Sequence, residues 1–174
     1  MHFDVIQGNI TQQTAHGLVN TISPDCRMEC GVSEEISKHT NGSLAEKIAK
    51  EQPIDSGAVL VTAAYELPVI YLFHAVPVSK DGTVTEDTIR SVTRTVLEQA
   101  DELECRSLIF PLLGCGGGGY NLKAGATCIC EEIWQFIPES LADIRVIGHT
   151  ESDFEQLLEV ARDVKASSDP LERA

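Results

Sequence analysis

The fold is decided by the stretch Ser107-Leu108-Ile109-Phe110-Pro111-Leu112-Leu113-Gly114-Cys115-Gly116-Gly117-Gly118-Gly119-Tyr120. Its first half is an apolar run that predicts a buried strand, and the segment after it, Leu122 to Phe136, predicts a helix. In an open α/β sheet, the loop between such a strand and helix lies at the carboxyl edge, where ligands bind. Consecutive glycines let the backbone approach a ligand closely, and their amides can form an anion-binding nest. The loop therefore predicts a phosphate site, with a flexible connector as the alternative.

Strands and helices alternate along the rest of the chain. This order predicts an α/β fold with a central mixed, mostly parallel sheet covered on both faces. We expect a single domain over residues 1–166 and a mobile C-terminal tail over residues 167–174. The expected strands cover residues 2–7, 17–22, 57–62, 69–76, 107–113 and 144–149, and the expected helices cover residues 33–50 (interrupted at Asn41-Gly42), 85–103, 122–136 and 153–166.

The composition limits the classes of partner. The chain has 174 residues, of which 43% are hydrophobic, and a formal net charge of −14. So acidic a chain argues against nonspecific nucleic-acid binding and against docking on anionic membranes. It does not exclude a small anion held by backbone amides. The N-terminus, Met1-His2-Phe3-Asp4, has no targeting pattern, so we expect a cytoplasmic protein whose six cysteines are free thiols.

We compare the sequence of the glycine loop with three known kinds of phosphate site, which it does not match equally well. No Lys-Ser or Lys-Thr follows the glycines, as a nucleotide triphosphatase would require. Gly114-x-Gly116-x-x-Gly119 matches the dinucleotide fingerprint formally, but it comes late in the chain, so an NAD-dependent oxidoreductase is a weak alternative. The third arrangement needs a second loop, and residues 25–32 lie between a predicted strand and a predicted helix. Two such loops could hold a diphosphate from both sides.

Taken together, several short segments resemble the macrodomain family in order and spacing. The resemblance covers about Phe3 to Ala161. It implies a three-layer α/β/α fold that binds ADP-ribose, or an ADP-ribosylated macromolecule, without a metal or a cofactor. Many members also hydrolyse mono-ADP-ribosyl adducts or O-acetyl-ADP-ribose. The segments that carry the resemblance are Val5-Ile6-Gln7-Gly8-Asn9-Ile10-Thr11, Leu18-Val19-Asn20, Gly31-Val32, Phe73-His74-Ala75-Val76 and Phe110-Pro111-Leu112-Leu113-Gly114-Cys115-Gly116.

The resemblance also implies which residues meet the two ends of the ligand. Asn9 and Ile10 would lie beside the adenine, with Asn9 contacting its amino group. His149 would flank the adenine, or else be an ordinary surface histidine at a strand end. Asn20 and Ser23 would border the distal ribose.

The diphosphate would lie between the two loops. Cys30, Gly31 and Val32 would contact it from the first loop. The second loop would wrap around it, and Tyr120 would either close over the ligand or pack beneath the loop. The loop residues concerned are Gly114, Cys115, Gly116, Gly117, Gly118 and Gly119.

Departures from the family pattern leave the chemistry open. Many members carry Asp at the position of Asn9, and Ser23 replaces the usual second Asn. The segment Ile22 to Met28 resembles the terminal ADP-ribose protein glycohydrolases, but their catalytic Lys and Asp map near Ala63 and Gly118. We therefore assign no catalytic residue. The domain would be either a water-mediated hydrolase or a non-catalytic reader of ADP-ribose.

Two other groups of side chains offer weaker chemistry. Asp25 and Glu34 could assist a water-mediated reaction, although both are also ordinary surface carboxylates. A zinc site built from four cysteines matches no strong spacing template, so we expect no metal. The cysteines are Cys26, Cys30, Cys128 and Cys130.

Overall fold

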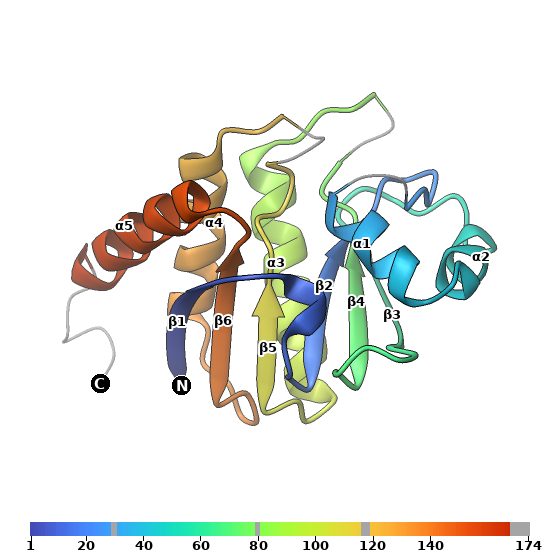
Figure 1. The fold of residues 1–174 in the computed structure, drawn as a ribbon. Coiled ribbons are helices and arrows are strands. Elements are labelled where there is room, and N and C mark those ends of the chain that lie inside the picture. The colour runs from blue at the N-terminus through green and yellow to red at the C-terminus, as the bar shows by residue number, and fades with distance from the viewer. Residues whose placement is uncertain (29–30, 79–80, 116–118, 168–174) are drawn as a thin grey trace.

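The computed structural model describes residues 1–28, 31–78, 81–115 and 119–167. Within these ranges, six strands form one sheet in the order β1-β6-β5-β2-β4-β3 (Figure 1). All neighbouring strands are parallel except β3, which runs antiparallel to β4 at the edge of the sheet. The predicted mixed, mostly parallel sheet is confirmed. The strands are β1 (His2–Gln7), β2 (Gly17–Thr21), β3 (Val59–Ala63), β4 (Tyr71–Ala75), β5 (Ser107–Phe110) and β6 (Asp143–Gly148).

Helices cover both faces of the sheet and make three layers. One face packs against α3 (Glu86–Glu102), α4 (Leu122–Gln135) and α5 (Glu151–Ser167). The other face packs against the 3-10 helix η1 (Ile10–Gln12), α1 (Gly31–His39) and α2 (Ser43–Ala49).

Alternation along the strands supplies both cores. Because successive side chains of a strand point to opposite faces, Val19 and Phe73 enter the core under α3, α4 and α5. Their neighbours Leu18 and Leu72 enter the core under α1 and α2. All four side chains are fully buried. The resulting three-layer α/β/α fold is the one that the sequence predicts.

The long predicted helix over residues 33–50 is two helices. Asn41 and Gly42 both have left-handed backbone, with φ of 51° and 75°. A left-handed residue cannot continue a right-handed helix, so α1 ends at His39 and α2 begins at Ser43. The expected interruption at this pair is confirmed, and α1 begins at Gly31, two residues before the predicted start.

The strand of the opening stretch ends earlier than its apolar run. β5 stops at Phe110, whereas the run continues to Leu113. Pro111 has no N–H to donate to a sheet ladder, so the chain leaves the sheet there and crosses its carboxyl edge. Ser167, which we expected to begin the tail, is the last residue of α5, and residues 168–174 lie outside the described ranges.

The carboxyl ends of the parallel strands meet at one edge of the sheet (Figure 1). The register pairs Gln7 at the end of β1 with Gly148 at the end of β6. Gly8 N donates to Gly148 O across 3.1 Å, which holds the two following loops together. No described helix combines the length and the apolar character needed to cross a membrane.

Candidate functional site

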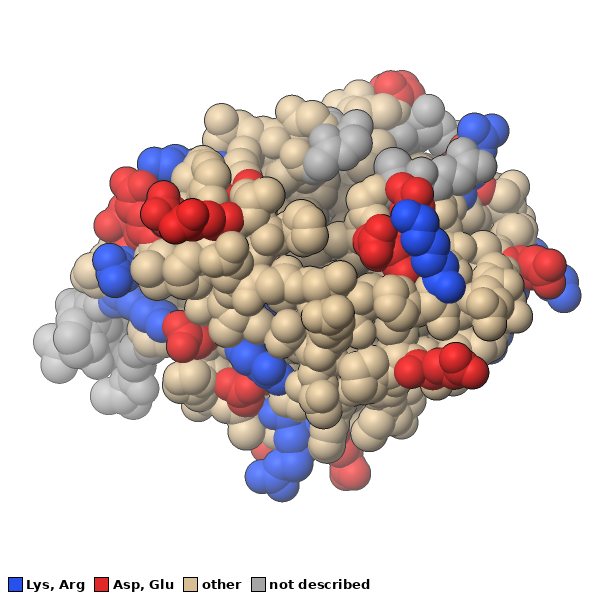
Figure 2. Space-filling view, in the orientation of Figure 1, with Lys and Arg blue, Asp and Glu red and all other residues tan. Residues whose placement is uncertain are grey.

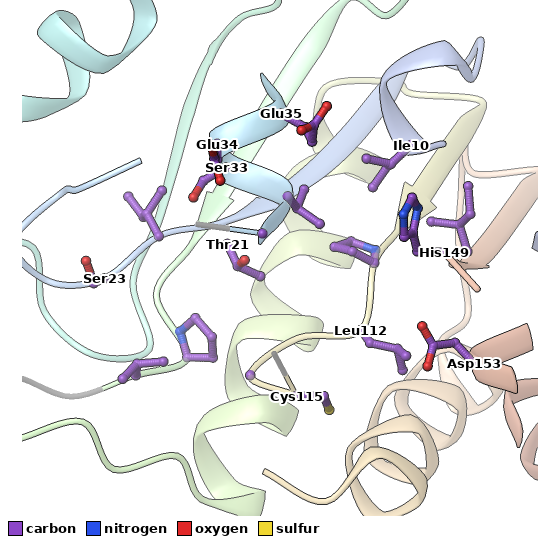
Figure 3. A pocket seen from close by; sticks show the side chains of 18 of the residues that line it. Ile10, Thr21, Ser23, Ser33, Glu34, Glu35, Leu112, Cys115, His149 and Asp153 are labelled. Carbon is purple, nitrogen blue, oxygen red and sulfur yellow. The ribbon is translucent and has the colours of Figure 1, made fainter. Parts of the chain in front are cut away.

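A cavity of about 780 Å³ opens at this carboxyl edge (Figure 3). Loops that follow β1, β2, β4, β5 and β6 all contribute to it, together with the first residues of α1. The lining residues are Gly8, Asn9, Ile10, Thr21, Ile22, Ser23, Arg27, Gly31, Val32, Ser33, Glu34, Glu35, Pro77, Val78, Gly82, Pro111, Leu112, Gly114, Cys115, Leu122, Ile147, His149 and Asp153.

One end of the cavity is an apolar slot beside β1 and β6. Ile10, Ile147 and Leu112 line it, and His149 stands beside Ile10 (Figure 3). The slot forms because the paired strand ends place the β1–η1 loop next to the residue that follows Gly148. Flat apolar walls with an aromatic ring suit a planar heterocyclic base.

Asn9 is one polar side chain at this end, where Asp153 also lies beside Leu112, and η1 fixes the orientation of Asn9. Asn9 is the N-cap of η1, and its Oδ1 accepts from Thr11 N at 2.9 Å. The same oxygen accepts from Thr11 Oγ1 at 2.7 Å. The amide oxygen is thus occupied within the protein, and the Nδ2 group is the part of the side chain left for a ligand.

The opposite end of the cavity carries a hydroxyl and a charged pair. Ser23 Oγ donates to Asp25 Oδ1, and Arg27 Nε lies 3.0 Å from Asp25 Oδ2. The hydrogen bond from Ser23 lowers the pKa of Asp25, and the charge of Arg27 lowers it further against the opposing effect of desolvation. Asp25 is therefore ionised near neutral pH and engages both neighbours.

Backbone from two segments contributes to the wall of the cavity. On one side, the first N–H groups of α1, at Gly31 and Val32, have no partner inside the helix. On the other side, Gly114 turns the chain with a φ of +71°, and Tyr120 N donates to Gly114 O across 3.1 Å. Amides at a helix N-terminus favour an anion between these two walls.

Cys115 lies in the second wall but is not activated. Its Sγ lies 3.3 Å from Leu113 O, to which the thiol donates. Burial raises the pKa of Cys115 to about 11. Since the thiolate is the nucleophilic form, this side chain is a neutral thiol at physiological pH.

A buried polar network links β2, β4 and β3. Asn20 and His74 are fully buried side by side on β2 and β4, where the register pairs them. Asn20 Nδ2 donates to His74 Nδ1 at 3.0 Å, and His74 Nε2 lies 2.8 Å from Thr62 Oγ1. Burial lowers the pKa of His74 to about 3, with a smaller contribution from the charge of Lys47. Its ring is therefore neutral and can accept at Nδ1 and donate at Nε2.

The structure brings together most of the residues that the sequence nominates. Eight of them line the cavity: Asn9, Ile10, Ser23, Gly31, Val32, Gly114, Cys115 and His149. Three described residues do not. Asn20 is fully buried, Gly119 is exposed, and Tyr120 packs against the core under α3 and α4. Cys30, Gly116, Gly117 and Gly118 lie outside the described residues.

The remaining nominated groups do not gather at the cavity. Cys26 packs in the core on the α1 side of the sheet, whereas Cys128 and Cys130 pack on the opposite side, so these thiols cannot share a metal. All five described cysteines are free, as expected for this part of the chain. Ala63, where the resembling glycohydrolases have Lys, is the exposed last residue of β3 and does not line the cavity.

Sequence reasoning missed three parts of the wall. Arg27 received no role from the sequence, although it is the only Lys or Arg among the described lining residues. The segment after β4, with Pro77, Val78 and Gly82, carries no recognisable motif. Asp153 was expected only as the start of a helix. The close spacing of Asp25 and Arg27 was the one signal that sequence offered for a charged pair.

Among the described residues that line the cavity, most charged side chains are acidic. Glu34, Glu35 and Asp153 line it against the single guanidinium of Arg27. On the face drawn in Figure 2, acidic and basic side chains lie in small mixed groups, without one large basic patch. Attraction of an anionic ligand therefore has to come mainly from the amide walls.

The fold and the cavity define a class of protein: a three-layer α/β/α domain with a nucleotide-sized site at the carboxyl edge of its sheet. Residues 19–129 match the family model of the Macro domain. The chain belongs to the macro domain family.

Sequence relatives of this chain come from bacteria and archaea. An uncharacterized protein of Mycobacterium tuberculosis is 27% identical over 149 residues, which cover 86% of this chain and 42% of the relative. The chain thus spans less than half the length of that relative. An uncharacterized protein of Aquifex aeolicus is 29% identical over 150 residues (84% and 90%), and a macro domain-containing protein of Caldanaerobacter subterraneus is 26% identical over 158 residues (87% and 90%).

Solved structures share the fold. An Oceanobacillus iheyensis macrodomain variant with ADPR superposes with a TM-score of 0.86 at 22% identity, covering 94% of this chain and 93% of the other. The Trypanosoma brucei macrodomain in complex with ADP-ribose gives a TM-score of 0.83 at 22% identity, covering 91% and 68%. At 22% identity, the similarity to these solved structures shows that the chain shares their three-layer fold.

Proposed function

We propose that this domain binds ADP-ribose, or an ADP-ribosyl group on a macromolecule, in the cavity at the carboxyl edge of the sheet. The observation that carries the proposal is the order of chemistry along one cavity. An apolar slot that suits a base lies at one end, the amide N-terminus of α1 that suits a diphosphate follows, and a polar end that suits a ribose comes last. The volume of about 780 Å³ lies in the range of small-molecule sites. Two solved structures of the same fold are described as holding this ligand.

The amide walls account for anion binding by an acidic protein. N–H groups at a helix N-terminus carry partial positive charge that no titration removes. The α1 terminus at Gly31 supplies such groups at the cavity wall, and the turn at Gly114 brings a second stretch of backbone to the lining. The Arg27 guanidinium at the polar end adds one charge, which Asp25 largely offsets.

Isothermal titration calorimetry with ADP-ribose tests the proposal. Gly31→Asp should weaken binding at least ~10-fold, because a carboxylate would stand in the diphosphate wall. Gly42→Asp is the matched control. Both glycines have left-handed backbone, and a Cβ at either position meets no atom within 4 Å, but Gly42 does not line the cavity. Absence of binding by the unmodified protein would refute the proposal, and equal loss in both variants would place the ligand elsewhere.

Hydrolysis of an ADP-ribosyl bond is the second candidate function. The observation that favours it is the pair of carboxylates, Glu34 and Glu35, that α1 brings to the cavity wall (Figure 3). A carboxylate beside the bound ribose could accept a proton from an attacking water. Release of ADP-ribose from a mono-ADP-ribosylated protein, compared between the unmodified protein and Glu34→Gln, tests this activity. Tight binding without turnover on protein adducts or O-acetyl-ADP-ribose would identify a reader.

The glycine fingerprint does not favour an oxidoreductase. The stretch from Gly114 to Gly119 follows β5, not the first strand of the fold. The dinucleotide fingerprint belongs to the first βα unit, and here that position is taken by Gly8-Asn9 and the short η1 helix.

A further inference from the structure

The sheet ends at two outer strands, β1 on one side and β3 on the other (Figure 1). An outer strand presents a row of backbone N–H and C=O groups that no neighbouring strand satisfies, and such a row can pair with another chain. Proteins usually protect these rows with charged side chains, a proline or a covering loop. The two outer strands of this sheet differ in that protection.

Charged side chains protect the β1 edge. Alternate residues of β1 bond to β6, and Phe3 and Val5 belong to the set that faces outward. Phe3 O accepts from Lys165 Nζ at 2.6 Å, and Val5 N donates to Asp4 Oδ1 at 2.8 Å. A lysine and an aspartate thus occupy outward backbone groups that another strand would need.

The β3 edge lacks such protection. Val76 N donates to Ala58 O at 3.0 Å, and the antiparallel register continues this pairing, so every second residue from Ala58 bonds to β4. The residues between them, Val59, Val61 and Ala63, turn their N–H and C=O groups away from the sheet. Within the part of the chain that the structure describes, the one partner of these groups is the hydroxyl of the preceding threonine, which donates to Ala63 O at 3.0 Å.

The surface at this edge is uncharged and partly apolar. β3 has the sequence Val-Leu-Val-Thr-Ala, and the nearest acidic residues along the chain are Asp55 and Glu66, beyond its two ends. Two exposed apolar side chains, Tyr65 (46% exposed) and Ile70 (54% exposed), lie in the turn between β3 and β4. In a chain of net charge −14, such a stretch is where two copies can approach with the least repulsion.

We propose that two copies of this chain pair through β3 as an antiparallel dimer with two-fold symmetry. Pairing centred on Val61 places the two Val61 residues opposite each other and Val59 opposite Ala63 of the other copy. Each outward N–H then faces an outward C=O, and none is left over. On the other face of the sheet, Leu60 lies opposite Thr62, so no charge enters the pairing. The two-fold axis supplies this match by itself, whereas an unrelated strand would have to carry it in its own sequence. The inference is independent of the ligand in the cavity.

Val61→Pro tests the pairing at its centre. The N–H of Val61 points outward, so proline removes a donor that β4 does not use, and proline is tolerated at such positions of edge strands. In the dimer, the change removes two hydrogen bonds, one from each copy, and should weaken association at least ~10-fold. Val5→Pro is the matched control, because it removes an outward N–H on the protected β1 edge and should leave association unchanged.

Sedimentation velocity over a range of protein concentration measures the association. The unmodified protein and Val5→Pro should dimerise, and Val61→Pro should require a much higher concentration. Raising NaCl from about 0.1 to about 1 M should strengthen the dimer, because salt screens the repulsion between two acidic copies. A chain that stays monomeric at every concentration, a dimer that Val61→Pro leaves unchanged, or a dimer that salt dissociates would each overturn the proposal.

Hydrogen exchange tests the same pairing in the unmodified protein, without any effect of proline on the fold. In the monomer, the amides of Leu60 and Thr62 are bonded to β4 and should exchange slowly, whereas those of Val59, Val61 and Ala63 face solvent and should exchange fast. At concentrations at which the dimer forms, these three amides should become protected. If they exchange equally fast at low and high concentration, β3 is not the interface, even where the chain dimerises through another surface.

Discussion

Replacing His74 should remove a large part of the acid sensitivity of this domain. The ring is 0% exposed, and burial lowers its pKa from 6.5 to about 3. In the unfolded chain the same ring takes up a proton near pH 6.5. Acid therefore favours the unfolded state, and the loss begins as the pH falls below 6.5 and continues until it approaches 3. We expect His74→Gln, which cannot take up this proton, to lack that part of the pH dependence.

The magnitude follows from the two pKa values. Between pH 7 and pH 5, protonation of the unfolded chain at this one site costs the folded state about 2 kcal/mol. Urea unfolding at both values of pH measures it: the free energy of unfolding should fall by about 2 kcal/mol more in the unmodified protein than in His74→Gln. Nuclear magnetic resonance of the His74 ring gives an independent check, because the ring should stay neutral at pH 5. Parallel pH profiles of the two proteins, or a ring that titrates near pH 6.5, would refute the reasoning.

Three further outcomes are expected. Gly114→Ala should lower the free energy of unfolding by about 2–4 kcal/mol in a urea titration, because φ is +71° and the new Cβ would lie 2.8 Å from Val84 Cγ1. Gly82→Ala is the control, since Gly82 has a φ of +82° with open space around it, and it should lower the free energy of unfolding by only about 1–2 kcal/mol. Ser23→Ala should raise the pKa of Asp25, measured by carboxyl resonance titration, because the hydroxyl is the largest cause of its lowering; an unchanged midpoint would contradict the geometry. Raising NaCl from about 0.1 to about 1 M should weaken ADP-ribose binding by less than ~2-fold, and a steep loss in calorimetry would show that side-chain charge attracts the ligand.

The fold was predictable because its signals are local. Short apolar runs mark the strands and helical patterns mark the longer helices, although η1 was not predicted, and the pair Asn41-Gly42 marks the break between α1 and α2. The boundaries that shifted have equally local reasons. At Pro111 the apolar run continues, but the missing N–H ends β5.

The interior of the site was less predictable, because it depends on register. In the sequence, His74 is a single polar residue within an otherwise apolar strand. Only the pairing of β2 with β4 shows that it meets Asn20, and only the pairing of β4 with β3 brings it near Thr62. For the same reason, the sequence did not show that Asn20 is fully buried and donates to the His74 ring, and its place beside the ribose stays a prediction.

The amide of Asn9 shows a similar limit. The sequence shows that Asn9 replaces the Asp that many macrodomains have at this position. It therefore suggests that Asn9 makes the same contact with the adenine amino group, but a weaker one. In the structure, the Asn9 oxygen already accepts two hydrogen bonds from Thr11. What remains for a ligand is the amide nitrogen, which donates a hydrogen bond and does not accept one. The hydrogen bond within the protein decides which end of the side chain a ligand can use.

The acidity of the chain and the anion site are compatible because they act over different distances. The net charge of −14 sets a long-range field that salt screens within about 10 Å at 0.1 M. In the proposed site, the amides at the start of α1 would act over hydrogen-bond distances inside a partly enclosed cavity, where screening is weak. Arg27 could have supplied long-range attraction, but its ion pair with Asp25 at 3.0 Å cancels most of its field. The protein can therefore keep an acidic surface, with its benefit for solubility, and still offer a short-range site for a diphosphate.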